Sequence, residues 1–211
     1  MAFFIGRDRE ARRAYGFDEI ALVPGDVTVN PDEVDTTLHI GPVKLDIPFL
    51  ASAMDGVVDV EFAIAMGKLG GLGVLNLDGI STRYDKPREI VSRIAGATPE
   101  EATRLVQEMY RPPIKEELIA ERIRQIKAAG VPCAISTIPQ NAEKFGGIAA
   151  KAGADIFVVQ STVTTVRHKA TKYKPFEIAP FCKTMKIPVI VGNCVTYSVA
   201  TELMDAGVSG L

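Results

Sequence analysis

The sequence predicts a protein of the α/β class, in which helices cover a parallel sheet. Five short and nearly continuous apolar runs are expected as strands, at 47–52, 72–76, 132–137, 155–160 and 187–192. Such runs are typical of strands that are buried on both faces, whereas a half-exposed strand alternates apolar with polar residues. Helical segments separate the runs, and small polar residues follow them. This alternation indicates a repeated strand–helix unit with one shared ligand-binding edge.

The first part of the chain shows no such alternation. Residues 1–44 are broken by Pro24-Gly25, Asn30-Pro31 and Gly41-Pro42, with short extended pieces between these breaks. We expect residues 1–44 to form an arm that packs on the main domain, and residues 45–211 to form that domain.

Seven helices are expected in the main domain, several of them with a clear stop signal. Glycine follows the helical pattern at Gly130, Gly153 and Gly207, where a left-handed residue would end the helix before the next strand. The expected helices lie at 59–69, 87–95, 99–109, 115–129, 141–152, 176–185 and 196–206.

The number of units predicts a (β/α)8 TIM barrel, truncated after about five βα units. A sixth strand would begin at 207–211, the last of the 211 residues, and a closed barrel of this type takes about 250 residues. A doubly wound open sheet is the alternative. The glycines at 70–73 do not favour its dinucleotide-binding form, because they follow a helix and precede a strand, the reverse of the phosphate-binding order.

Composition points to a small-molecule partner. The 211 residues carry a formal net charge of −2 and no basic cluster with aromatics, so neither nucleic acid nor an anionic membrane is an expected partner. No apolar run approaches the roughly 18 residues of a membrane span, and the amino-terminal residues lack a signal-peptide core, so we expect a cytoplasmic protein. The three cysteines, Cys133, Cys182 and Cys194, are expected as reduced thiols, and two histidines make a His-based zinc site unexpected.

Polar residues at the ends of the expected strands are the candidate site. Ligands of parallel α/β folds bind at the carboxyl ends of strands. Each candidate also has a structural interpretation: Ser52 or Asp55 could cap the next helix, Met54 could fill the core, and the Asn193 amide could bond its own turn. The candidates are Ser52, Met54, Asp55, Asn76, Asp78, Ser136, Thr137, Gln160, Ser161, Asn193 and Cys194.

Two further features could bear on chemistry. Cys194 could be a nucleophile near a helix start, but no base is evident nearby and a packed thiol is the alternative. The basic segment 167–174 could meet a phosphorylated ligand or could be a solvated loop. No lysine stands at an expected strand end, which argues against a Schiff-base enzyme.

At these residues the chain resembles the IMP dehydrogenase/GMP reductase family. The resemblance rests on YGFDEIALVPG at 15–25, VDTTLHIGPVKLDIPFLASAMDGV at 34–57, GGLGVL at 70–75, IPVIVGNCVT at 187–196 and LMDAGVSGL at 203–211. It is strongest to the short bacterial subgroup that is related to IMP dehydrogenase and lacks CBS domains. Segment 77–114 is too short to contain CBS domains.

The resemblance implies a usually tetrameric (β/α)8 barrel that exchanges hydride with NAD or NADP, with a possible monovalent cation. Ser52 and Met54 would bind the purine nucleotide monophosphate, Met54 against the base, and Asn193 would lie beside both the purine and the nicotinamide. Gln160 and Ser161 would lie at the nicotinamide ribose. The family's nucleophilic cysteine, which bonds to purine C2, would follow Leu211, so no catalytic residue and no metal ligand is expected within this chain.

The chain departs from the family at three positions: Gln160 replaces a usual aspartate, Asn76 a common histidine and Gly56 a usual threonine. The expected reaction is oxidation of IMP to XMP with NAD and water. GMP reductase, with NADPH and release of ammonia, is the alternative that this half of the site does not separate from it. A flavin-binding barrel and a non-catalytic binding or structural fragment are the other classes left open.

Overall fold

The computed structural model describes residues 3–7, 9–11, 13–167, 171 and 175–211. By its internal contacts the chain divides into two units, Met1–Asp35 and Thr36–Leu211. Residues 36–44, predicted as part of the arm, belong by these contacts to the larger unit. That the arm packs on the barrel stays a prediction.

The smaller unit contains little regular structure. Its described elements are a two-residue antiparallel pair, β1 (Phe3–Phe4) with β2 (Glu10–Ala11), and two 3-10 turns, Phe17–Glu19 and Pro31–Glu33. The second turn begins directly after Asn30, with Pro31 in its first position, because a proline ring is already set for that backbone angle.

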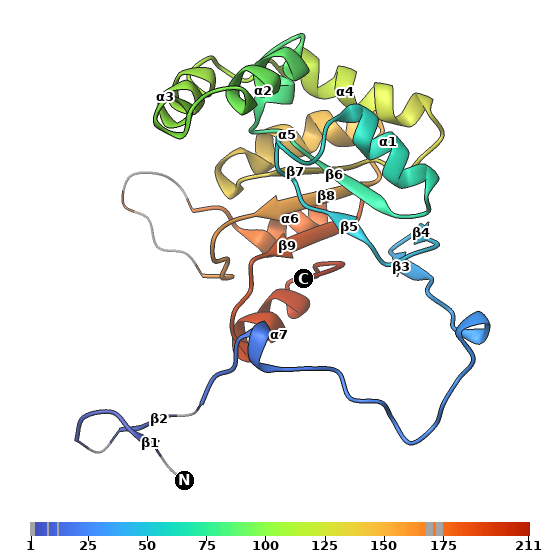
Figure 1. Cartoon of the computed structure of the whole chain (residues 1–211), viewed down its shortest axis with the longest axis vertical. Coiled ribbons are helices and arrows are strands. Elements are labelled where there is room, and N and C mark those ends of the chain that lie inside the picture. The colour runs from blue at the N-terminus through green and yellow to red at the C-terminus, as the bar shows by residue number, and fades with distance from the viewer. Residues whose placement is uncertain (1–2, 8, 12, 168–170, 172–174) are drawn as a thin grey trace. The chain divides into compact units, whose positions relative to one another are not determined.

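The larger unit is built on a five-stranded parallel sheet whose strands follow one another in chain order (Figure 1). This sequential order excludes the doubly wound alternative, in which the strand order reverses at a switch point. The strands are β5 (Leu50–Ala51), β6 (Leu72–Asn76), β7 (Ala134–Thr137), β8 (Ile156–Gln160) and β9 (Val189–Gly192).

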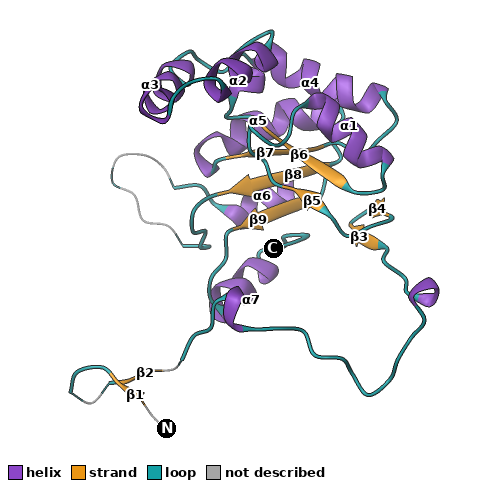
Figure 2. Cartoon of the chain, in the orientation of Figure 1, coloured by secondary structure: helices purple, strands orange, loops and turns teal. Residues whose placement is uncertain are grey.

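The helices lie where the sequence predicted them, within two residues at each end. Helices α1, α4 and α5 pack side by side and with the strands, whereas α2 and α3 pack against each other and α2 also packs against the turn Ile80–Thr82 (Figure 2). The bounds are α1 (Val60–Lys68), α2 (Pro87–Ala95), α3 (Pro99–Met109), α4 (Glu116–Ala128), α5 (Pro139–Ala152), α6 (Ile178–Thr184) and α7 (Tyr197–Asp205).

Backbone details follow the sequence closely. Gly130, Gly153 and Gly207 all have positive φ, which confirms the left-handed stops. The first strand is shorter than predicted, since Pro48 lacks the N–H that a ladder requires. After α7, Ser209 N donates to Val189 O at 2.7 Å and Gly210 forms a parallel bridge with Ile190. A sixth parallel strand therefore begins where the sequence predicted one, and the sheet matches half of a (β/α)8 barrel.

The core has two layers, one on each face of the sheet. On the helix side, Ile119, Ile123 and Ile126 of α4 pack with strand residues such as Ile135 and Phe157. On the inner face, residues that are paired in register form an apolar layer with the hairpin of β3 (Leu38–Ile40) and β4 (Val43–Leu45). This inner layer consists of Ile40, Leu45, Leu72, Val74, Ala134 and Ile156. Layered side chains of this kind are typical of the inside of a barrel.

Candidate functional site

Polar side chains replace the apolar inner layer at the carboxyl ends of the central strands. Asn76 is paired in register with Ser136, one pleat beyond Val74 and Ala134. The buried Ser136 hydroxyl donates to Gln160 Oε1 at 3.1 Å. Because this bond occupies the Gln160 carbonyl while its amide nitrogen has no partner among the described residues, Gln160 can donate to a ligand more readily than it can accept from one.

Backbone hydrogen bonds join the segments that follow β8 and β9. Ser161 N donates to Gly192 O at 2.7 Å, and Asn193 N donates to Ser161 O at 2.9 Å. Thr164 extends this pairing, since its N donates to Asn193 O and its hydroxyl to Gly192 O, both at 2.8 Å. The structure thus brings Gln160, Ser161 and Asn193 together, and it leaves the Asn193 side chain exposed.

Ser52 and Met54 follow β5, at the opposite edge of the open sheet from Asn193. The structural interpretations of these residues, Ser52 as a helix cap and Met54 as part of the core, are both wrong. The N-cap of α1 is Asp59, whose carboxylate accepts from Phe62 N at 2.8 Å, so neither Ser52 nor Asp55 caps that helix. Met54 is 52% exposed and therefore does not fill the core.

Asp78, a candidate from its position after β6, is occupied by structural bonds. It accepts from the Thr137 hydroxyl at 2.7 Å, from Ile138 N at 2.8 Å and from Asn141 Nδ2 at 2.5 Å. These donors lie at the start of α5, so Asp78 satisfies that helix terminus from a neighbouring loop. Asp78 and Thr137 are therefore unsuited to binding a ligand.

A second carboxylate at the carboxyl edge of the sheet, that of Asp55, has an unusual environment that the sequence did not predict. The Tyr110 hydroxyl donates to Asp55 Oδ2, although 55 positions separate the two residues in the chain. Asp55 Oδ1 is buried with no hydrogen-bond partner among the described residues. Burial and this bond to Asp55 raise the pKa of Tyr110 above its usual value. No sequence pattern marks Tyr110, because the contact arises only when segment 77–114 folds back.

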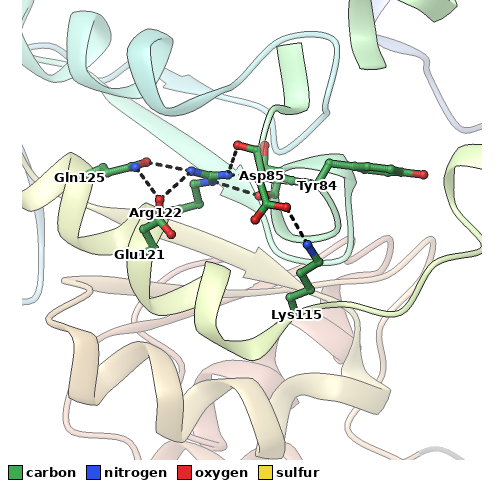
Figure 3. Close-up of polar contacts among 7 residues, drawn as sticks. Tyr84, Asp85, Lys115, Glu121, Arg122 and Gln125 are labelled. Carbon is green, nitrogen blue, oxygen red and sulfur yellow. Dashed lines mark hydrogen bonds and ion pairs between the residues drawn. The ribbon is translucent and has the colours of Figure 1, made fainter. Parts of the chain in front are cut away.

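The base of that segment is held by a buried arginine (Figure 3). Arg122, on α4, is 5% exposed and donates to three backbone carbonyls, those of Ser81 and Tyr84 at 3.1 Å each and of Asp85 at 2.9 Å. Its remaining nitrogen bonds Glu121 and Gln125 at 3.2 and 3.3 Å. Arg122 therefore fixes the loop that leads from β6 into α2.

A hollow of about 250 Å³ opens beside the paired segments. Ser161, Thr164 and Thr165 line one part of it, although their hydroxyls donate to backbone carbonyls, and α5 and the loop before α6 form most of the rest. The other lining residues are Pro139, Gln140, Glu143, Val163, Pro175, Phe176 and Ile178.

The cysteines and the basic segment offer little catalytic chemistry. Burial raises the pKa of the Cys133 thiol to about 12 and also raises that of Cys182. Cys194 is half-buried, and its sulfur donates to Thr196 O at 3.5 Å. Arg167 pairs with Glu202 at 2.6 Å, and residues 168–170 and 172–174 of the basic segment lie outside the described residues. Within the part of the chain that is described, no helix has the length and apolarity to cross a membrane, and no cluster of three or more His, Cys, Asp or Glu residues offers a metal site.

Comparison with known proteins agrees with the motifs. Residues 14–211 match the IMP dehydrogenase / GMP reductase domain family. An uncharacterized oxidoreductase of Mycobacterium tuberculosis is 35% identical over 98% of this chain and 56% of its own length. The inosine-5'-monophosphate dehydrogenase of Methanocaldococcus jannaschii is 42% identical over 73 residues, which are 35% of this chain and 15% of that protein.

A solved structure shares the fold. The crystal structure of an IMP dehydrogenase/GMP reductase-like protein from Corynebacterium glutamicum aligns with a TM-score of 0.90 and 36% identity, over 98% of this chain and 56% of that one. The chain thus spans about half the length of the relatives that it matches along nearly its whole length. The resemblance inferred from the motifs is confirmed: the chain belongs to the IMP dehydrogenase/GMP reductase family of oxidoreductases.

Proposed function

We propose that the protein to which these residues belong oxidises IMP to XMP, with NAD as hydride acceptor and water as the second substrate. The observation that carries the proposal is the location of the family's segments. Ser52 and Met54, Gln160 and Ser161, and Asn193 all lie at or shortly after the carboxyl ends of strands of one parallel sheet. This edge is where folds of this type bind ligands.

The nucleotide would be held from two sides. The exposed Met54 side chain offers a polarisable apolar surface to the flat purine, and the Ser52 hydroxyl offers one donor and two acceptor sites to its polar groups. The Asn193 side chain, which is exposed and carries both a donor and an acceptor, would orient purine and nicotinamide toward each other. These residues would position the reactants, which alone can contribute a large share of the rate.

The residues at the carboxyl end of β8 fit a nicotinamide nucleotide. Ser161, which follows Gln160, lines a hollow of about 250 Å³ together with Thr164, Thr165 and Phe176. This mixture of polar and aromatic residues suits a ribose together with a flat base. When bound, NAD accepts the hydride that leaves purine C2. Gln160 would donate to a ribose oxygen, where the family's usual aspartate would accept from a ribose hydroxyl.

None of the three cysteines is proposed as the nucleophile that bonds purine C2. Cys133 is buried with a pKa of about 12, Cys182 also has a raised pKa, and Cys194 precedes α7 with no histidine described near it. We propose that this cysteine follows Leu211 in a longer native chain, as the family resemblance implies, and that the native protein is a homotetramer.

GMP reductase, with NADPH and GMP, is the second candidate. Gln160 is the observation that keeps it open, because its side chain offers a ribose different hydrogen bonds from those of the usual aspartate and so bears on the choice of cofactor.

The test is a pair of steady-state assays on the native-length protein, IMP with NAD and GMP with NADPH. Turnover of IMP with NAD supports the proposal, and turnover of only GMP with NADPH selects the alternative. Asn193→Ala should lower kcat/KM in whichever assay is active, while Arg124→Ala, an exposed change on α4, should not. A yellow flavin spectrum with neither activity would overturn both candidates. Intact mass of the same sample shows whether residues follow Leu211.

A further inference from the structure

Segment 77–114 leaves the sheet at the end of β6, forms α2 and α3, and returns at Tyr110 to the carboxyl edge of the sheet, where Tyr110 contacts Asp55. Its return is tied to its departure by Arg83, which donates to Asp78 O at 3.0 Å and also to Pro112 O. The Arg83 guanidinium carbon lies 5.7 Å from the centre of the Tyr110 ring, within the range of a cation–π contact. The Tyr110 side chain is therefore held in place by its own segment.

Tyr110 in turn holds Asp55, in the loop that follows β5. The Tyr110 hydroxyl donates to Asp55 Oδ2, and the Asp55 carboxylate lies against the backbone of Gly79. A Cβ on Gly79 would overlap both carboxylate oxygens, so a side chain there would displace Asp55. Because Oδ1 has no hydrogen-bond partner among the described residues, the bond from Tyr110 is the one that fixes this carboxylate.

The orientation of Asp55 bears directly on its neighbour Met54. Met54 N donates to Ser52 O at 2.8 Å, and Val57 N and Val58 N both donate to Met54 O at 2.9 Å, so residues 52–58 form one tight turn. The preceding strand β5 has only two residues and lies at the sheet edge, and the turn is buried in the core at its far end, at Val58, whereas Met54 is 52% exposed. A shift of Asp55 would therefore move Met54.

We infer that Tyr110 is a positioning residue through which the α2–α3 segment sets the nucleotide-binding turn 52–58. This inference rests on the proposed function in assigning Ser52 and Met54 to the nucleotide. Tyr110 itself is assigned no contact with substrate. The Tyr110 hydroxyl acts through Asp55. Tight nucleotide binding therefore requires α2 and α3 to be folded.

Tyr110→Phe tests the inference, because it removes one hydroxyl and keeps the ring under Arg83. Tyr84→Phe is the matched control: the Tyr84 hydroxyl donates to Met109 O at 3.0 Å within the same segment and does not contact Asp55. In the native-length protein, Tyr110→Phe should raise the KM for the purine nucleotide roughly tenfold, as expected for loss of a hydrogen bond to a charged group. The KM for the nicotinamide cofactor and the Tm should stay near the native values, and Tyr84→Phe should leave both KM values unchanged.

A conservative change at Asp55 distinguishes a positioning role of Tyr110 from a purely stabilising one. Asp55→Asn retains an oxygen that accepts from Tyr110 and should keep the nucleotide KM nearer the native value than Asp55→Ala does. Tyr110→Phe combined with Asp55→Ala should be no worse than Asp55→Ala alone, since both changes remove the same contact. If Tyr110→Phe lowers the Tm without changing the nucleotide KM, or if Tyr84→Phe has the same effect, the inference is overturned.

Amide hydrogen exchange distinguishes failure of the inference from failure of the proposed function. Exchange at Met54, Val57 and Val58 should accelerate in Tyr110→Phe and not in Tyr84→Phe, whether or not the protein acts on purine nucleotides. If the native protein lacks both activities while these amides respond, the proposed function fails and the structural link stands. Unchanged exchange in Tyr110→Phe would overturn the link itself.

Discussion

Replacement of Arg122 by methionine should destabilise the protein by about 3 kcal/mol. The guanidinium satisfies the carbonyl oxygens of Ser81, Tyr84 and Asp85. An acceptor that is left buried without a partner costs about 1–3 kcal/mol. Ser81 is buried and would bear this cost in full, Tyr84 is half-buried and would bear part of it, and the carbonyl of the exposed Asp85 can bond water instead.

The measurement is urea unfolding of the native-length protein, in which the midpoint shift at constant slope gives the change in free energy of unfolding. Arg124→Met is the control, since Arg124 is exposed on the same helix and arginine and methionine have similar helix propensities. Arg122→Lys should fall between the native protein and Arg122→Met, because an ammonium group cannot reproduce the planar fork. A loss below about 1 kcal/mol for Arg122→Met, or one equal to that of Arg124→Met, would refute the reasoning.

Three further changes should have measurable effects. Gly73→Ala would place a Cβ 2.7 Å from the backbone of α1 and should lower the free energy of unfolding by about 1–3 kcal/mol, measured by the same urea titration; a neutral result would show that α1 can move away. Cys133, buried with a pKa of about 12, should react with iodoacetamide far more slowly than the half-buried Cys194 at neutral pH, and equal labelling by mass spectrometry would contradict its burial. Burial alone would raise the pKa of Asp59, but bonds from Arg88 at 2.6 Å and from the α1 backbone outweigh burial and set the pKa below the usual 3.8. Asp59→Asn should therefore destabilise the protein at neutral pH, and the stability difference between the native protein and this variant should disappear as the pH falls below 3.8. A stability difference that persists in acid would point to a cause other than charge.

The strand–helix pattern could be predicted from the sequence because it depends on local signals. Continuous apolar runs indicated the strands, and Gly130, Gly153 and Gly207 indicated the helix ends, each through a backbone angle that few other residues adopt. The exception was the first strand, where the effect of Pro48 outweighed the apolar pattern around it.

The candidate site was predicted less completely, since position after a strand does not reveal what a side chain contacts. Asp78 lay at the expected edge, yet it bonds the start of α5 rather than remaining free for a ligand. Several residues before α1 could have been its N-cap, and the sequence could not indicate that Asp59 is the one. The contact of Tyr110 with Asp55 depends on how segment 77–114 folds back, which no local pattern encodes.

The hairpin β3–β4 has a consequence for how the chain folds during its synthesis. A Cβ on Gly41 would lie 2.6 Å from Pro188, so the hairpin turn lies directly against the entry to β9. The two residues are roughly 150 positions apart, and at the usual pace of translation Pro188 leaves the ribosome on the order of ten seconds after Gly41. During this interval the hairpin turn lacks its contact with Pro188, although Ile40 and Leu45 of the hairpin are already available to pack on Leu72 and Val74. The hairpin can therefore pack on the first strands of the sheet early in synthesis, whereas its contact with the entry to β9 forms only late.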